Sequence, residues 1–274
     1  MPMVRAAIRL RMVSAAIVNI IAVTAFASAQ SSDISQNEKT ATPSVVRVAE
    51  PSTDDDADDT STLIVAADFN RDGIADVAKI ILHVDGTSDP GNLVVSLGQR
   101  NGGFRPTSYL QLSGQNPRAI VAGDFNNDGN PDLIVGNEDG TLTLFPGNGT
   151  GSFSSAQQLP PQGSVVSIAV ADFNNDGIPD IAVSDWRGSL VTVLAGTGKG
   201  SFEYLRSFPL RMRGTRPHIA AADFNGDGIA DLAVIYENDD GDTFDVMLGN
   251  GNGSFTIAPD RGLARNPNSH CNIL

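Results

Sequence analysis

Residues 168–180 read Ile-Ala-Val-Ala-Asp-Phe-Asn-Asn-Asp-Gly-Ile-Pro-Asp, and close variants of this stretch occur at three other places in the chain. The other copies are Ile64–Asp76, Ile120–Asp132 and Ile219–Asp231. Their first aspartates follow one another at intervals of about 50 residues, which is typical of propeller blades and longer than most helical repeats. The chain is therefore predicted to be built from four copies of one structural unit.

The third copy shows what one unit contains. A short strand is expected at 166–172, a polar loop at 174–180 and a second strand at 181–186. The alternating residues at 190–194 predict a third strand, and 202–206 begin a fourth. Clusters of glycine and asparagine separate these runs and supply the turns of an antiparallel meander.

The fold class predicted from these units is all-β, a propeller of four four-stranded antiparallel blades. The expected blades are about 62–112, 118–161, 165–211 and 217–260. Four blades can form a closed ring, but an open array, a truncated chain or a half-ring completed by self-association fits the sequence as well. In each unit the phenylalanine after the first aspartate is expected to pack between neighbouring sheets; these are Phe69, Phe125, Phe173 and Phe224.

Both ends of the chain differ in composition from the repeats. Residues 1–29 have an arginine-containing start, an apolar run and a small-residue site ending at Ala29, which predicts a signal peptide. Residues 30–61 are acidic and rich in Ser and Thr, as in a disordered linker, although Val45–Val48 could pair as an edge strand. Residues 261–274 form a predicted tail. We therefore expect a chain that is secreted or at the cell surface or periplasmic, without a membrane span after signal cleavage.

Charge and cysteine content exclude several functions. The 274 residues carry a formal charge of −14, which disfavours binding to nucleic acid. The single cysteine rules out an intramolecular disulfide framework and zinc sites built from several cysteines. The excess negative charge lies in the repeated loops and in the acidic run of residues 54–59, so these loops are expected to require a cation.

The repeated loop has the pattern Asp-x-Asn-x-Asp-Gly-x-x-Asp. Oxygen ligands at positions 1, 3 and 5, a glycine at position 6 and a backbone carbonyl at position 7 are typical of a calcium loop, and position 9 adds a carboxylate. About four Ca²⁺ sites are therefore predicted. Their ligands are Asp68, Asn70, Asp72, Ile74 and Asp76; Asp124, Asn126, Asp128, Asn130 and Asp132; Asp172, Asn174, Asp176, Ile178 and Asp180; and Asp223, Asn225, Asp227, Ile229 and Asp231.

Two other interpretations of this loop were weighed. An EF-hand requires a glutamate at position 12 and flanking helices, whereas position 12 here lies in an apolar strand and is Lys79 or a valine. A turn-rich loop that binds no metal would also contain Asn, Asp and Gly. Four complete copies of the ligand pattern favour calcium over both.

The loop and its surroundings resemble the FG-GAP/VCBS repeat family, which also builds the propeller head of integrin α-subunits. The resemblance covers roughly residues 62–260 and implies a β-propeller with calcium between the first two strands of each blade. It implies the ligand positions named above. The family commonly builds seven blades, whereas this chain has four copies of the unit.

The function expected from the sequence is a secreted calcium-binding module, not an enzyme, that binds an extracellular protein or carbohydrate. Stacking of a sugar or partner on Trp186 and contact of the cluster Arg211, Arg213 and Arg216 with an acidic glycan are weighed against a packed hairpin and a solvated connection. A polysaccharide-acting enzyme is one alternative, with Asp239, Asp240 and Asp242 as an unrepeated acidic cluster within the repeat region. A purely structural adhesion repeat is the other.

Overall fold

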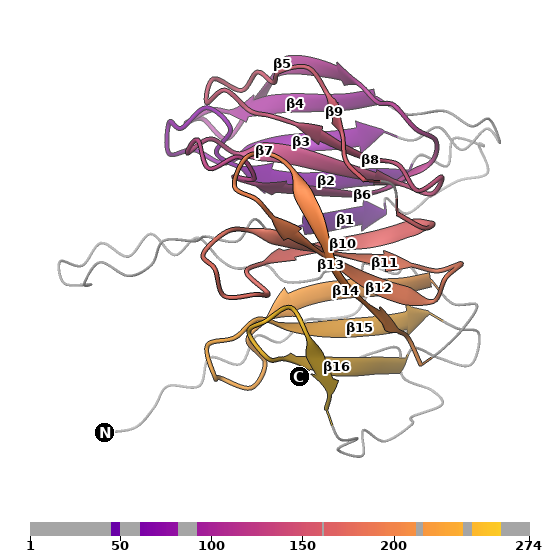
Figure 1. The fold of residues 1–274 in the computed structure, drawn as a ribbon. Helices are drawn as coiled ribbons and strands as arrows, with labels where there is room; N and C mark the ends of the chain where they lie inside the picture. Colours follow the sequence, from indigo (N-terminus) through magenta and orange to yellow (C-terminus); the bar gives the residue numbers. More distant parts are fainter. Residues whose placement is uncertain are drawn as a thin grey trace, which may run out of the picture.

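The fold is an array of four antiparallel β-sheets that follow one another along the chain (Figure 1). The computed structural model describes residues 45–49, 61–81, 92–160, 162–211, 216–237 and 243–258. Within these ranges there are strands and turns and no helix. The prediction of an all-β, propeller-like arrangement of four-stranded blades is confirmed.

Each sheet is a meander in which every strand pairs with the next. The first sheet contains β1 Val45–Ala49, β2 Ser61–Ala67, β3 Asp76–Ile81, β4 Asn92–Gly98 and β5 Phe104–Gln111. The second contains β6 Pro117–Gly123, β7 Asp132–Asn137, β8 Leu142–Phe145 and β9 Gln157–Gln158. The third contains β10 Val165–Ala171, β11 Asp180–Asp185, β12 Leu190–Gly196 and β13 Phe202–Pro209. The fourth contains β14 Arg216–Ala222, β15 Asp231–Glu237, β16 Thr243–Gly249 and β17 Phe255–Ile257.

The extra strand of the first sheet is β1, which pairs antiparallel with β2. This confirms the prediction that Val45–Val48 could form an edge strand. The remainder of the predicted signal peptide and linker, the C-terminal tail and the cluster Asp239, Asp240 and Asp242 lie outside the described residues. No described helix is long and apolar enough to cross a membrane.

Neighbouring sheets contact one another through their first strands. β6 lies against β2 and against β10, and β10 lies against β14. No comparable contact joins the strands of the first sheet to those of the fourth. Closure between the first and fourth sheets is therefore not seen among the described strands, and these two sheets lie apart in Figure 1.

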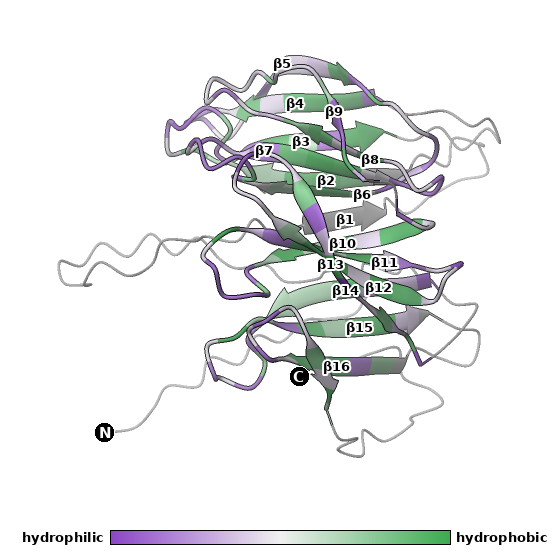
Figure 2. Cartoon of the chain, in the orientation of Figure 1, coloured by the Kyte–Doolittle hydropathy of each residue, from purple (hydrophilic) through white to green (hydrophobic). Residues whose placement is uncertain are grey.

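The core consists of three apolar layers, each between two successive sheets. The strands that build these layers are hydrophobic over most of their length, whereas the turns between them are hydrophilic (Figure 2). Because each layer is shared by two sheets, one sheet alone cannot bury its apolar faces, and stability depends on the neighbour.

The repeated phenylalanines behave as predicted in three of the four units. Phe69, Phe125 and Phe173 are fully buried, and each ring meets a phenylalanine of the next sheet at a centroid distance of 5.6–5.7 Å. The prediction is wrong for Phe224, which is 49% exposed. The physical reason is that the partner ring belongs to the following sheet, and no further sheet follows the fourth in the described part of the chain.

Candidate functional site

The four repeated loops lie at the same end of their sheets. Each connects the first strand of a sheet to the second, as between β10 and β11. They appear together on the left of Figure 1. The sequence repeat therefore becomes a spatial repeat, with four chemically equivalent loops along one edge of the array.

The third loop shows the common geometry. Asp172 accepts hydrogen bonds from the backbone N–H of Asp176 (3.0 Å) and of Gly177 (2.8 Å). The Asn174 side-chain oxygen accepts from the same N–H of Asp176 at 2.9 Å. The backbone φ is +63° at Asn175 and +83° at Gly177. These left-handed residues turn the chain so that the side-chain oxygens of positions 1 and 3 gather around one backbone N–H.

The other three loops repeat these hydrogen bonds. In each, the aspartate at position 1 accepts from the N–H groups of positions 5 and 6, and the asparagine at position 3 accepts from that of position 5. The aspartate at position 5 accepts from the N–H of position 7. The predicted ligand positions 1, 3 and 5 are thus brought together, at an exposed surface, in all four loops.

The aspartate at position 9 has a different environment. Asp180 is fully buried and accepts from the N–H groups of Phe173 (3.0 Å), Asn174 (3.2 Å) and Gly196 (2.8 Å). Its equivalents Asp76, Asp132 and Asp231 are also fully buried and make the corresponding bonds to the phenylalanine and to the glycine that ends the third strand. This carboxylate therefore ties the loop to the third strand of its own sheet.

The pKa is raised at several of the buried aspartates of position 9 and lowered at the exposed Asp223 of position 1. Burial raises the pKa of Asp132 and of Asp180 to about 6, against the backbone N–H bonds that lower it. Burial also raises the pKa of Asp76. At the exposed end of the fourth loop, the N–H of Gly228 donates to Asp223 and lowers the pKa of that carboxyl. Burial thus disfavours the charged form of the position-9 carboxyl in three of the four loops.

The donor set at the exposed end fits calcium in chemical type. It consists of oxygens only, from two aspartates and one asparagine per loop, and calcium prefers hard oxygen ligands. A Cβ built on the glycine at position 6 meets nothing within 4 Å in three of the four loops. The described residues contain no group of three His, Cys, Asp or Glu side chains that could hold a metal ion, because position 3 is an amide and position 9 is turned inward.

A glycine at or just after the end of β4, β8, β12 and β16 was missed as a site residue. A Cβ on Gly98, Gly147, Gly196 or Gly249 would overlap the backbone carbonyl of the residue before the position-9 aspartate. None of these four glycines has a positive φ, so the close approach of two backbones requires them, and each donates its N–H to that aspartate. Its recurrence at the same place in every unit was the signal, although a glycine at this place also fits a hairpin turn.

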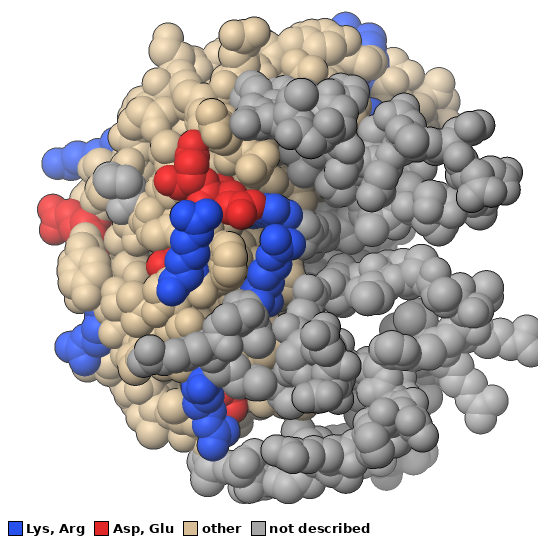
Figure 3. All heavy atoms as spheres, turned by 90° about the vertical axis from the view of Figure 1, so that its right-hand side faces the viewer, with Lys and Arg blue, Asp and Glu red and all other residues tan. Residues whose placement is uncertain are grey.

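A small cavity of about 150 Å³ lies at the opposite ends of the strands. Its lining comes from the second, third and fourth sheets and includes Arg118, Glu138, Trp186, Arg216 and His218. Figure 3 faces this side of the molecule and shows basic and acidic side chains gathered near its centre. The cavity is therefore separate from the four loops.

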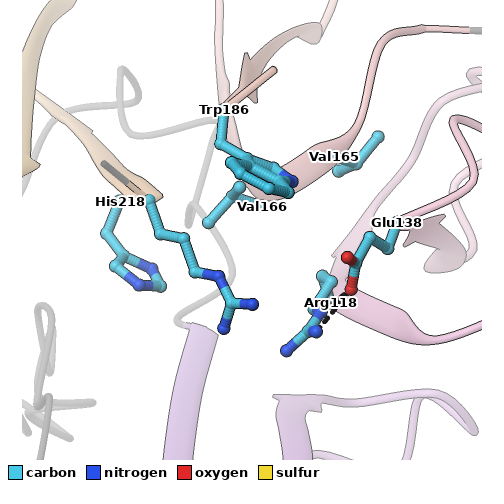
Figure 4. A pocket seen from close by; sticks show the side chains of 7 residues that line it. Arg118, Glu138, Val165, Val166, Trp186 and His218 are labelled. Atoms are coloured by element: carbon cyan, nitrogen blue, oxygen red, sulfur yellow. Dashed lines mark hydrogen bonds and ion pairs between the residues drawn. The ribbon is translucent and has the colours of Figure 1, made fainter. Parts of the chain in front are cut away.

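The side chains around this cavity hold one another in place (Figure 4). Arg118 forms an ion pair with Glu138, with its Nε 2.9 Å from the carboxylate. Trp186 is half-buried and donates from Nε1 to Ser164 at 2.6 Å. The guanidinium carbons of Arg187 and Arg216 lie 5.6 and 5.9 Å from the centroid of the Trp186 ring. The result is a hydrogen-bonded indole ring with two guanidinium groups over it.

The fold and the loops define the chain as a propeller-like repeat protein. The FG-GAP-like repeat matches residues 81–135, 124–183 and 180–234, and the FG-GAP repeat matches residues 217–257. These matches span more than half of the chain, and the chain belongs to the FG-GAP repeat family. The resemblance inferred from the loop pattern is thereby confirmed.

Two solved structures are similar to the chain. One is a functionally unknown protein from Desulfotomaculum acetoxidans, with 12% identity, coverage of 74% of this chain and 70% of that chain, and a TM-score of 0.46. The other is a protein from Lactobacillus plantarum, with 16% identity, coverage of 72% and 67%, and a TM-score of 0.44. No curated protein matches the chain.

Proposed function

We propose that this chain is a secreted calcium-binding propeller module that binds an extracellular ligand. The observation that carries the proposal is the fourfold repetition of one exposed set of oxygen donors in one backbone geometry. Calcium bound there would neutralise carboxylates that otherwise repel one another within a short loop. The aspartates and asparagine at positions 1, 3 and 5 would hold the ion, whereas position 9 supports the loop.

Calcium binding is tested by calorimetric titration and by thermal unfolding in calcium and in EDTA. Extracellular calcium modules bind in the range of about 10⁻⁴–10⁻³ M, and calcium at ten times the Kd stabilises by about 1.4 kcal/mol per site. Asp176→Ala removes an exposed donor from the third loop and is expected to reduce the number of sites by one. Unchanged melting temperature and no titration heat would exclude the calcium role.

The ligand we propose is a carbohydrate that carries carboxylate groups, bound at the cavity around Trp186. The apolar face of a sugar ring stacks on an aromatic side chain, and a guanidinium recognises a carboxylate through paired hydrogen bonds. Arg216 borders the Trp186 ring and has no carboxylate within ion-pair distance among the described residues. A protein ligand with acidic side chains is the alternative that the same chemistry would admit.

Binding is tested on an array of neutral and uronic-acid-containing glycans. We expect retention of the acidic glycans, a loss of binding in Trp186→Ala and Arg216→Ala, and unchanged binding in Arg206→Ala, which removes an exposed arginine elsewhere on the third sheet. Equal binding of neutral and acidic glycans would contradict the guanidinium argument. Release of reducing ends from the bound glycan would instead indicate an enzyme.

Secretion is part of the same proposal, since FG-GAP repeats are typical of extracellular domains. Cleavage after Ala29 would leave Gln30 as the first residue of the mature chain. Mass spectrometry of the protein recovered outside the producing cell is expected to show this N-terminus. Retention of the first 29 residues on the exported protein would contradict the predicted cleavage.

A further inference from the structure

A pair of phenylalanines joins each described sheet to the next, at three places in the array. At the two ends of the array the equivalent phenylalanines, Phe104 and Phe224, are exposed. Within the array, the phenylalanine of one loop stacks on a phenylalanine of the next sheet: Phe69 on Phe153, Phe125 on Phe202 and Phe173 on Phe255. Beside each ring pair, the carbonyl of the loop phenylalanine accepts an N–H from a turn glycine of the next sheet, at 2.8–3.0 Å. Each sheet contact thus has one donor side and one acceptor side.

Among the described residues, the acceptor side of the fourth sheet has no partner. Phe224, the equivalent of Phe173, is 49% exposed. The donor side of the first sheet likewise has no partner in the described part of the chain, where Phe104, the equivalent of Phe153, is 56% exposed. Gly102, which corresponds to the turn glycine Gly151, donates to the carbonyl of Gln99 within its own turn instead.

The apolar strand faces next to these phenylalanines are likewise buried inside the array and more exposed at its ends. In the third sheet, Ala169, Ala182 and Val193 are cross-strand neighbours on one face, and all three are buried against the fourth sheet. The equivalent row of the fourth sheet is Ala220, Ala233 and Val246. This row is equally apolar but only half-buried, although a face meant for solvent would alternate to polar residues.

The opposite end shows the complementary row. Ile64, Lys79 and Val94 are cross-strand neighbours in the first sheet. Ile64 is half-buried, whereas its equivalents Ile120, Ile168 and Ile219 are 1–4% exposed beneath the preceding sheet. Lys79 takes the position of the valines Val135, Val183 and Val234. Its apolar stem can lie along such a face while its ammonium group reaches solvent at the edge.

From these faces we infer that the fourth sheet of one chain docks on the first sheet of a second copy, head to tail. A second copy is the occupant because each end matches the other end through an interface already present three times within the chain. Among the described residues, no strand of the first sheet contacts the fourth sheet as neighbouring sheets contact one another, so we place this contact between chains. Two copies joined at both ends make a ring of eight blades, within the size range of propellers. If the second contact does not close the ring, the same head-to-tail docking continues to further copies and gives a filament.

The test measures molar mass in solution as a function of concentration, using the full secreted chain. The wild-type mass is expected to rise about twofold, and to rise at lower concentration in Lys79→Val. Phe224→Glu and Phe104→Glu are each expected to remain monomeric. Tyr204→Glu alters an aromatic side chain that is 67% exposed on the third sheet and serves as the matched control with wild-type mass.

Mixing the two end variants distinguishes head-to-tail docking from any other association. Phe224→Glu retains an intact first sheet and Phe104→Glu retains an intact fourth sheet, so an equimolar mixture is expected to form dimers that neither variant forms alone. A wild-type chain that stays monomeric at every concentration overturns the inference, and so does a mixture that stays monomeric. The readout is independent of calcium titration and glycan binding, so its failure is distinguishable from failure of the proposed function.

Discussion

Replacing Asp180 by alanine is expected to destabilise the protein even when no metal is bound. The carboxylate is the acceptor for the N–H groups of Phe173 and Gly196, and both bonds are buried. Each buried donor left without a partner costs about 1–3 kcal/mol, so the loss from two donors is about 2–6 kcal/mol. Removal of a buried charge, whose pKa is raised to about 6 by burial, offsets part of this loss and favours the lower half of that range.

The assay is urea unfolding in EDTA, followed by the fluorescence of Trp186. This is the only tryptophan, and it directly follows β11, the strand that begins with Asp180. Asp176→Ala is the matched control, because it removes an exposed carboxylate from the same loop. In EDTA the control is expected to change stability by less than about 0.5 kcal/mol. Equal losses for the two variants, or a loss below about 1 kcal/mol for Asp180→Ala, would refute the supporting role of position 9.

Three further predictions concern the sheets and their contacts. Gly196→Ala is expected to destabilise by about 1–3 kcal/mol through overlap with the carbonyl of Pro179, and a shift of the urea midpoint checks it; wild-type stability would contradict it. Phe125→Ala is expected to cost about 3–5 kcal/mol, whereas Phe224→Ala in the monomer costs less than about 1 kcal/mol; comparable losses would argue that Phe224 is buried. In EDTA, Asp132 and Asp180 are expected to add stability as the pH falls from about 7 to about 4, because their folded-state pKa of about 6 lies above the ordinary aspartate pKa of 3.8. Urea midpoints at several pH values measure this gain, and Asp180→Ala should reduce it; a midpoint that falls steadily over this range would contradict it.

Most of the architecture could be predicted because the decisive information is local and repeated. The loop at 172–180 and the turn at 196–200 contain the asparagine, aspartate and glycine residues that their backbone conformations require. The strands between them are short and apolar, and their boundaries in the third sheet fall within a few residues of those expected. Strand identity follows from such patterns, since turns and alternation are encoded within about ten residues.

What the sequence left open depends on contacts between sheets. Phe224 has the same neighbours in sequence as Phe173, yet one is exposed and the other is buried. The repeat pattern also does not reveal that the aspartate at position 9 is buried, with Asp180 accepting hydrogen bonds from the backbone N–H groups of Phe173 and Gly196. Neither difference is visible in a nine-residue motif, because each is set by residues of the third strand or of a following sheet.

The hydrogen bonds that Asp180 accepts lie within a single sheet, which bears on how the loop takes its shape. Its bonds reach back seven residues to Phe173 and forward sixteen to Gly196, so the curl of the loop closes within a single meander. The phenylalanine beside it must wait for the next meander to be synthesised. The loop of one blade can therefore take its shape from bonds within that blade, before the next blade packs against it.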